Sequence, residues 1–379
     1  MIGGIGKMRP CGHHHYYKYA HATSGSHPNN SDGKNRDMYQ VSREYWNDVD
    51  EDNCWNFSLE NATHLNNYCF ELGRFTKFKS KTPKLINAFA MFTHDNGRQG
   101  PTLTEIEMDY ENITNCEGLF YGSKLTDLPA NFNPATRNFT HLLTGGADSI
   151  ASAHGGVFPF YPVLNEATTT KQMFIRCKMY LDDNYTFEEV TNASDMFYAT
   201  GWETCLQECP KNLSFKKLKN AANCFYLYSS NRAPSTFSWF QTKDTMENLT
   251  TATNMFYRHN CLADLYPDYE SFSLPALSSA AGMFYQCILN AESIKKLSDA
   301  LPDWTGDTAS HPITIGCHID HKYDPEVNVA LKKLQSSYIT PIEELGAILP
   351  EEITTDKGWT LVVQWNGTAT ENAYPAPTV

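Results

Sequence analysis

Apolar and polar positions along this chain follow a motif that recurs eight times. Its clearest copy, residues 190–198, has the sequence Val-Thr-Asn-Ala-Ser-Asp-Met-Phe-Tyr. With Met196 as the reference position, the equivalent residues are Met91, Leu119, Leu142, Met173, Met196, Cys224, Met255 and Met283. The successive spacings of 28, 23, 31, 23, 28, 31 and 28 residues are typical of proteins in which each repeat is one structural unit packed against its neighbours.

Three motif positions are apolar or small in most copies and predict the inner side of each repeat. They lie six and three residues before the reference position and one residue after it, as at Val190, Ala193 and Phe197. The i, i+3, i+7 spacing places them on one face of a short helical turn. Apolar residues between copies, at 103–106 and 125–128, predict short strands. The predicted fold class is therefore α/β, a solenoid of short strands and short helical turns.

The position four residues before the reference is polar in every copy. A polar side chain inside an apolar motif needs a hydrogen-bond partner, and Asn, Thr and Ser can bond to backbone groups where the chain turns. This column predicts a structural ladder, and not a catalytic or binding site. Its residues are Asn87, Asn115, Asn138, Thr169, Asn192, Asn220, Thr251 and Ser279.

The parts of the chain differ in composition. Residues 1–55 are rich in Gly, His, Asn, Ser and Tyr, and predict an extended N-terminal arm that is ordered only against another surface. Residues 56–290 hold the solenoid, with an atypical first repeat near residues 59–65. Residues 291–379 predict a mixed α/β C-terminal cap. Within it we expect helices at 292–301 and after Asp324 and Thr340, and strands at 312–316 and 360–365.

The motif Val-Thr-Asn-x-x-x-Met-Phe-Tyr resembles the leucine-rich repeat of the BspA-like bacterial surface proteins. The C-terminal segments Leu-Pro-Asp-Trp-Thr-Gly at 301–306 and Lys-Gly-Trp-Thr at 357–360 resemble the end of such arrays. The resemblance spans about residues 85–365 and implies a leucine-rich-repeat-like solenoid. Similar arrays occur in secreted adhesins and in virion proteins of tailed bacteriophages. The long inserts and the segment 318–350 depart from the family, so no binding surface is carried over.

Charge and cysteine content narrow the class of partner and the compartment. The formal net charge of −13 argues against a nucleic-acid backbone or an anionic membrane surface as the main partner. The 11 cysteines form no compact disulfide framework, although Cys205 and Cys209 could pair. Cys116, Cys177, Cys224 and Cys287 substitute for core residues of the repeat and are expected to be unpaired and buried. No apolar signal-peptide segment or membrane-spanning run occurs.

Candidate chemistry is sparse, and the sequence predicts no enzyme, no cofactor and no metal site. His13–His15 with His21 and His27, and the run Cys317-His318-x-Asp320-His321, contain metal-ligand types without a zinc spacing. Asp182, Asp183, Glu188 and Glu189 could be imagined as a glycosidase pair. Repeat inserts project from one face, so the aromatic side chains that the motif does not explain predict a contact loop. They are Phe237, Trp239 and Phe240.

Three function classes remain: a bacteriophage virion protein (fibre, decoration or receptor-binding component), an exported bacterial cell-surface adhesin, and a carbohydrate-active enzyme on a repeat scaffold. The missing signal segment favours the first, because virion proteins assemble in the host cytoplasm. We then expect other virion or surface proteins to be bound through the N-terminal arm within an oligomeric assembly. A host-surface glycan or protein is a further expected partner, with neither nucleic acid nor membrane insertion involved.

Overall fold

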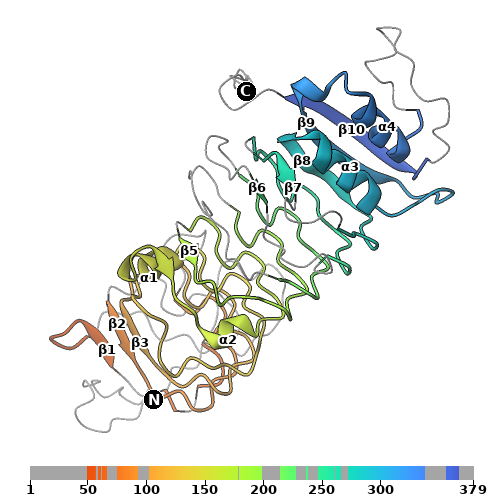
Figure 1. The fold of residues 1–379 in the computed structure, drawn as a ribbon. Helices are drawn as coiled ribbons and strands as arrows, with labels where there is room; N and C mark the ends of the chain where they lie inside the picture. The colour runs from red at the N-terminus through yellow and green to blue at the C-terminus, as the bar shows by residue number, and fades with distance from the viewer. Residues whose placement is uncertain are drawn as a thin grey trace, which may run out of the picture. The chain divides into compact units, whose positions relative to one another are not determined.

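The computed structural model describes residues 49–56, 59–60, 62–65, 75–92, 102–177, 179–198, 214–227, 236–237, 246–260, 262–265, 272–337 and 356–366. The predicted arm therefore lies almost entirely outside the described residues. The chain divides into two compact units, Met1–Gly155 and Gly156–Val379. Both combine short strands with few helices, in a mixed α/β arrangement (Figure 1).

The first unit contains a three-stranded parallel sheet. Its strands β1 (Cys54–Asn56), β2 (Lys77–Lys79) and β3 (Glu105–Glu107) lie in chain order, with Trp55 opposite Phe78 and Phe78 opposite Ile106. Each of these strands buries its middle side chain. Helix α1 (Ala147–Ala153) ends the described part of this unit.

The second unit begins with short parallel pairs and ends in a larger sheet. Strands β4 (Val157–Phe158) and β5 (Tyr180–Leu181) pair, as do β6 (Thr236–Phe237) and β7 (Asp264–Leu265). Helix α2 (Pro162–Asn165) follows β4 and begins with a proline, whose fixed φ suits the first turn of a helix.

The C-terminal sheet has the order β10-β9-β8, with all strands parallel. Its strands are β8 (Ala280–Leu289), β9 (His311–His318) and β10 (Trp359–Asn366), and the helices between them are α3 (Ala291–Ala300), the short 3-10 helix η3 (Ile319–His321) and α4 (Pro325–Leu334). Figure 1 shows α3 and α4 side by side on one face of this sheet.

The sequence predicts this region well because its helix starts carry clear capping residues. Asn290 accepts a hydrogen bond from the Ser293 N–H, and Asp324 accepts from the Glu326 and Val327 N–H groups. The helices expected at 292–301 and after Asp324 are confirmed as α3 and α4. The two expected strands are also confirmed, each longer than predicted. The helix expected after Thr340 lies outside the described residues.

Successive copies of the repeat motif lie parallel to one another within each unit. The residues four before the reference position form single parallel bridges, Asn87 with Asn115 in the first unit and Thr169 with Asn192 in the second. The second series continues through Asn220, Thr251 and Ser279. The first repeat near residues 59–65 joins in the same way, through a bridge between His64 and Asn87.

Backbone N–H groups at alternate motif positions donate to the next copy. The donors lie three and one residues before the reference position and one residue after it. Around Met196 the bonds run from Ala193 to Asn220, from Asp195 to Ala222 and from Phe197 to Cys224, each 2.9 Å long. The intervening N–H groups of Met196 and Tyr198 donate within the copy, to Ala193 and Asp195 at 3.1 and 3.2 Å. Alternate amides therefore join the copies, and those between close the turns.

The segment is not helical, which corrects the expected short helical turn. The residue before the reference position has a positive φ in all eight copies, at Ala90, Gly118, His141, Gln172, Asp195, Asn223, Asn254 and Gly282. A left-handed residue interrupts a right-handed helix at once. In the copy around Met196, the Met196 N–H donates to the Ala193 carbonyl, and Asp195 has the positive φ. Residues 193–196 therefore have the pattern of a type II turn, which requires φ > 0 at its third residue. Successive tight turns bury the same i, i+3, i+7 positions as a helix.

Side chains from the inner positions form a continuous core in the second unit. Five phenylalanines, one from each copy, stack face to face with ring centroids 5.5 to 5.7 Å apart. They are Phe174, Phe197, Phe225, Phe256 and Phe284, all almost fully buried. The offset contact of parallel rings is favourable beyond the area it buries. In the second unit, the Phe column and the hydrogen bonds between backbones therefore together set the distance between successive copies.

The strand predicted at residues 125–128 is wrong. Leu125 and Leu128 are buried, but no strand pairing includes them, and Pro129 follows directly. A proline there removes an N–H that a continuing ladder would use. The strand predicted at 103–106 is confirmed in part, since β3 covers its second half.

Gly118 tests the left-handed position without a packing change. A Cβ atom there would have its nearest neighbours at 3.8 to 4.0 Å, ordinary van der Waals distance, so substitution adds strain and no clash. Gly118→Ala is expected to lower the free energy of unfolding by about 1 to 2 kcal/mol, the cost of a left-handed alanine. Gly118→Asn should lower it less, because asparagine tolerates this conformation. Equilibrium urea unfolding measures both, and equal stability of the alanine variant and wild type contradicts the prediction.

Candidate functional site

The polar column uses its side chains inside each copy. In five copies the Asn Oδ1 accepts a hydrogen bond from the backbone N–H two residues later, at 2.9 to 3.2 Å, from Phe89, Glu117, Thr140, Ser194 and Ala222. The acceptors are Asn87, Asn115, Asn138, Asn192 and Asn220. The backbones of four of these asparagines, Asn87, Asn115, Asn192 and Asn220, bridge the copies, while the side chains of all five fix the turn that follows. The sequence predicts bonds from these side chains to backbone groups where the chain turns, and the five asparagines make such bonds.

The Thr and Ser members of the column lack this Asn geometry. Thr169, Thr251 and Ser279 keep the backbone bridges, and the Ser279 hydroxyl lies 3.0 Å from that of Thr253. Backbone bridges between copies therefore recur along the column, and the side-chain bond to the following turn belongs to the asparagines. None of these residues lines the groove between helices α3 and α4.

A second polar ladder, which sequence reasoning missed, crosses the copies at the left-handed position. The Asn223 amide donates to Asp195 Oδ1 at 3.0 Å, and the Asn254 amide donates to Asn223 Oδ1 at 3.2 Å. In the next copy the position is Gly282, where a Cβ would lie 2.0 Å from Asn254 Oδ1. Burial raises the pKa of Asp195, and the Asn223 bond opposes that rise. The recurrence of Asn, Asp and Gly before the reference residue was the signal.

A column of four tyrosines runs along the second unit, two residues after the reference position. Tyr198, Tyr226, Tyr257 and Tyr285 are half-buried, with ring centroids 4.7, 4.7 and 4.4 Å apart and planes within 15°. Because the rings cover one another's faces, the column presents ring edges and phenol groups. Burial, followed by the neighbouring phenols Tyr285 and Tyr226, raises the pKa of Tyr257.

The tyrosine column and the Asn ladder lie next to each other. A Cβ on Gly282 would come within 3.6 Å of the Tyr257 ring as well as meeting Asn254. The guanidinium of Arg258 lies 5.7 Å from the centroid of the Tyr257 ring. The face formed by Tyr198, Tyr226, Tyr257, Tyr285, Asp195, Asn223, Asn254 and Arg258 is here called the tyrosine face. It offers phenol, amide and guanidinium groups held by backbone pairing, which suits non-covalent recognition.

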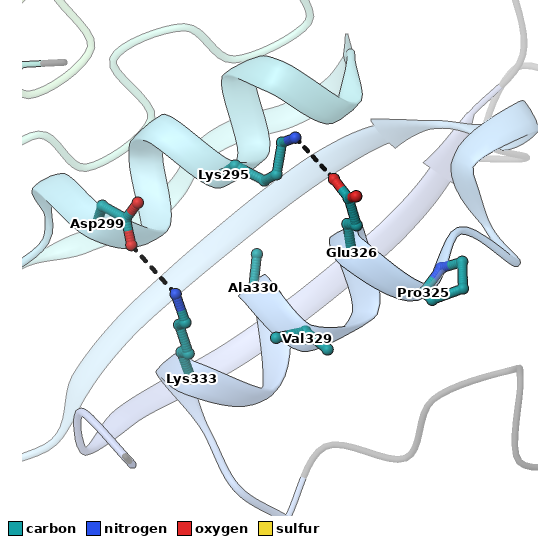
Figure 2. Close-up of a pocket in the computed structure, with 7 residues that line it drawn as sticks. All are labelled: Lys295, Asp299, Pro325, Glu326, Val329, Ala330 and Lys333. Carbon is teal, nitrogen blue, oxygen red and sulfur yellow. Dashed lines mark hydrogen bonds and ion pairs between the residues drawn. The ribbon is translucent and has the colours of Figure 1, made fainter. Parts of the chain in front are cut away.

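The groove between α3 and α4 is a second candidate. It has a volume of about 320 Å³ and is lined by Lys295, Asp299, Pro325, Glu326, Val329, Ala330 and Lys333. Figure 2 shows its charged residues engaged across the two helices, Lys295 with Glu326 at 2.9 Å and Lys333 with Asp299 at 3.4 Å. The remaining lining is aliphatic and proline. Exposed ion pairs of this kind contribute up to about 1 kcal/mol to stability. Because both lysines and both carboxylates are engaged in these pairs, the groove is a contact between two helices and offers no reactive group of its own.

The acidic residues considered as a glycosidase pair are used in structural contacts. Glu188 and Glu189 form ion pairs with Lys216 and Lys217 of the next copy, at 2.5 and 2.6 Å. Asp182 accepts a hydrogen bond from the Asn184 N–H at 2.9 Å, which closes a turn. None of these carboxylates lines the groove between α3 and α4.

The run from Cys317 to His321 is divided between a core and a surface. Cys317 is fully buried at the end of β9, and burial raises the pKa of its thiol, which disfavours the thiolate that binds metals. His318 Nδ1 accepts a hydrogen bond from the Asp320 N–H at 3.2 Å and so acts as a helix cap. In the described part of the chain, no three His, Cys, Asp or Glu side chains gather as a metal site.

Several predicted contact residues fall outside what is described. The backbone of Phe237 belongs to β6, whereas Trp239, Phe240, Cys205, Cys209 and the histidines of the arm lie outside the described residues. The prediction for the core cysteines is confirmed: Cys116, Cys177, Cys224 and Cys287 are at most 1% exposed. The thiols of Cys116, Cys177 and Cys287 donate to backbone carbonyls within 3.3 to 3.8 Å.

The chain matches no protein-family model, no curated protein and no solved structure. No helix in the described residues combines the length and apolar character that crossing a membrane requires.

The polar column is tested by removing its acceptor. Asn192→Leu and Asn220→Leu are each expected to lower the free energy of unfolding by about 1 to 3 kcal/mol, because the N–H of Ser194 or Ala222 loses its partner. Asn192→Asp keeps an acceptor oxygen at the same place and should cost less. Thermal and urea unfolding measure the differences, and unchanged stability in both leucine variants rules out this role.

His259 gives the second unit a predictable acid sensitivity. Its ring is buried, with Nε2 bonded to the Phe225 carbonyl, and burial lowers the pKa to about 4. A lowered histidine pKa favours the folded state above the unfolded value of about 6.5 and loses that contribution as pH falls toward the folded value. Between pH 7 and pH 5 the loss is about 2 kcal/mol.

The measurement is urea unfolding at both pH values for wild type and His259→Gln. The variant should lose roughly 2 kcal/mol less than wild type over this interval, since glutamine does not titrate. Equal pH dependence of wild type and His259→Gln excludes His259 as the source.

Proposed function

We propose that this chain is a non-enzymatic binding and assembly protein built on a leucine-rich-repeat-like solenoid. The observation that carries the proposal is the regular donation of alternate backbone N–H groups from one copy to the next, on both units. In such a fold each repeat depends mainly on its neighbours, so outward side chains are free to form a recognition surface. The repeated left-handed turns and stacked Phe column support the same assignment.

The tyrosine face is the proposed recognition surface. Tyrosine combines a large apolar ring with a polar hydroxyl and is enriched at protein interfaces. Stacking restricts the four rings, so little side-chain entropy is lost when a partner binds. The Asn ladder beside them adds amide groups whose positions are fixed by bonds from copy to copy. A host-surface glycan or protein is the partner class proposed for this face.

The biological setting proposed is a bacteriophage virion, as a fibre, decoration or receptor-binding component. Support comes from the resemblance of the repeat to BspA-like arrays and from buried thiols that suit assembly in a reducing cytoplasm. The N-terminal arm is the proposed attachment to other virion proteins. An exported cell-surface adhesin is the alternative, and a carbohydrate-active enzyme on the same scaffold is a second alternative.

The setting is tested by locating the protein in an infected or producing culture. Density-gradient fractions of purified particles and the cleared medium are analysed by quantitative mass spectrometry. We expect the protein to co-sediment with the particles in a constant ratio to their main structural protein. Recovery only in the medium or on the surface of uninfected cells contradicts the virion assignment and favours the adhesin. Deleting residues 1–48, which leaves strand β1 and the buried Trp55 in place, should leave a folded protein that no longer joins the particles.

A further inference from the structure

Strand β10 lies at the edge of the C-terminal sheet. The order β10-β9-β8 gives it one strand neighbour, and the register runs without interruption from Trp359 opposite His311 to Asn366 opposite His318. Among the described residues, no strand pairs with its other side. An edge strand presents a row of N–H and C=O groups that can pair with another chain.

The direction of these groups follows from one hydrogen bond. The Leu361 N–H donates to Oε1 of Gln335, at the C-cap of α4, at 2.8 Å, and therefore points away from β9. Backbone groups alternate along a strand, so those of Val363 and Trp365 point the same way. No described residue bonds to these two N–H groups. On the outward edge of β10, the N–H groups of Val363 and Trp365 thus have no partner among the described residues, and that of Leu361 is bonded only to a side chain.

The composition of β10 is unusual for an edge in an acidic protein. Its sequence Trp-Thr-Leu-Val-Val-Gln-Trp-Asn contains no charge and no proline, although the chain carries a net charge of −13. Val362 is 51% exposed, and Leu361, Val363 and Trp365 are half-buried. Edge strands are normally protected by charges, prolines or bulges, and β10 has none of these along its eight residues.

We propose that β10 pairs with β10 of a second copy of this chain, antiparallel and with the two-fold axis at Val363. In this register Val363 faces its own equivalent, and Leu361 faces Trp365 of the other copy. All three residues have outward backbone groups, so each facing pair exchanges two hydrogen bonds once the Leu361 N–H leaves Gln335 Oε1 for the carbonyl of Trp365 of the other copy. The sheet then continues through both copies, from three strands to six.

Side-chain chemistry favours a second copy as the occupant. In this register the half-buried Leu361 and Trp365 lie directly opposite each other, a favourable aromatic and aliphatic cross-strand pair. Val362 lies opposite Gln364, so the exposed valine is covered and no charge is desolvated. An uncharged strand can meet itself without the like-charge repulsion that charged edge strands impose. This inference is independent of the proposed function.

The test uses the full chain with opposite charges at the two-fold axis. Sedimentation equilibrium should give a dimer for wild type. Val363→Lys and Val363→Glu should each weaken dimerisation about ten-fold or more, because like charges then face each other. An equal mixture of the two variants should restore a dimer that contains one of each. Such rescue separates a lost contact from misfolding, since a misfolded chain is not restored by its opposite.

Val362→Lys is the matched control, since it introduces the same charge one residue away, opposite an uncharged Gln364. It should dimerise far better than Val363→Lys. In the wild-type dimer, the amides of Val363 and Trp365 should exchange hydrogen more slowly than in the Val363→Lys monomer. A wild-type monomer, single variants that dimerise like wild type, or a mixture that stays monomeric overturns the proposal. If β10 instead pairs with a strand of a different protein, the wild-type chain alone is a monomer.

Discussion

The fold depends on the pairing of backbone N–H groups between copies of one motif. A chain that advances by parallel copies leaves a row of amides on each copy, and every one that is buried needs an acceptor. Here alternate amides meet the next copy, the amides between them close tight turns, and an asparagine side chain takes the remaining one in five copies. Besides the left-handed residue before the reference position, five copies have a second one three residues after it, at Gly122, Gly145, Arg176, Arg258 and Gln286.

Side chains then follow from positions that the backbone has fixed. Equivalent positions stack like residues on like. This gives the Phe column of the core, with ring centroids 5.5 to 5.7 Å apart, and the tyrosine column of the surface, with centroids 4.4 to 4.7 Å apart. The same repetition places Glu188 and Glu189 opposite Lys216 and Lys217, and Asp195 opposite Asn223. A repeat of this kind must end, and the C-terminal sheet covers the last copy, with its own edge at β10. In the proposed dimer, the backbone groups at the edge of β10 would likewise pair with those of a neighbouring strand.

The sequence was sufficient for the inner positions and for the C-terminal elements. Val190, Ala193, Met196 and Phe197 are buried as predicted, because apolar residues that recur at a fixed period in stacked repeats lie on the side that packs inward. The turn conformation was missed, since helical turns and successive tight turns bury the same spacing. The Asn, Asp and Gly residues before the reference position, such as Asn223 and Gly282, distinguish the two. The tyrosine face could not be derived, because the i, i+3, i+7 spacing assigns Phe197 to the inner face and leaves the side of Tyr198 unassigned.

Residue-resolved hydrogen exchange on the native chain tests the pairing of copies most directly. Pairing between copies predicts similar, strong protection for the amides three and one before and one after the reference position, in all of the copies around Met196, Cys224 and Met255. Their protection should be lost together as urea is added, because each copy depends on its neighbours. Exchange at the rate of an unstructured peptide in any one of these copies, while its neighbours remain protected, would contradict the account.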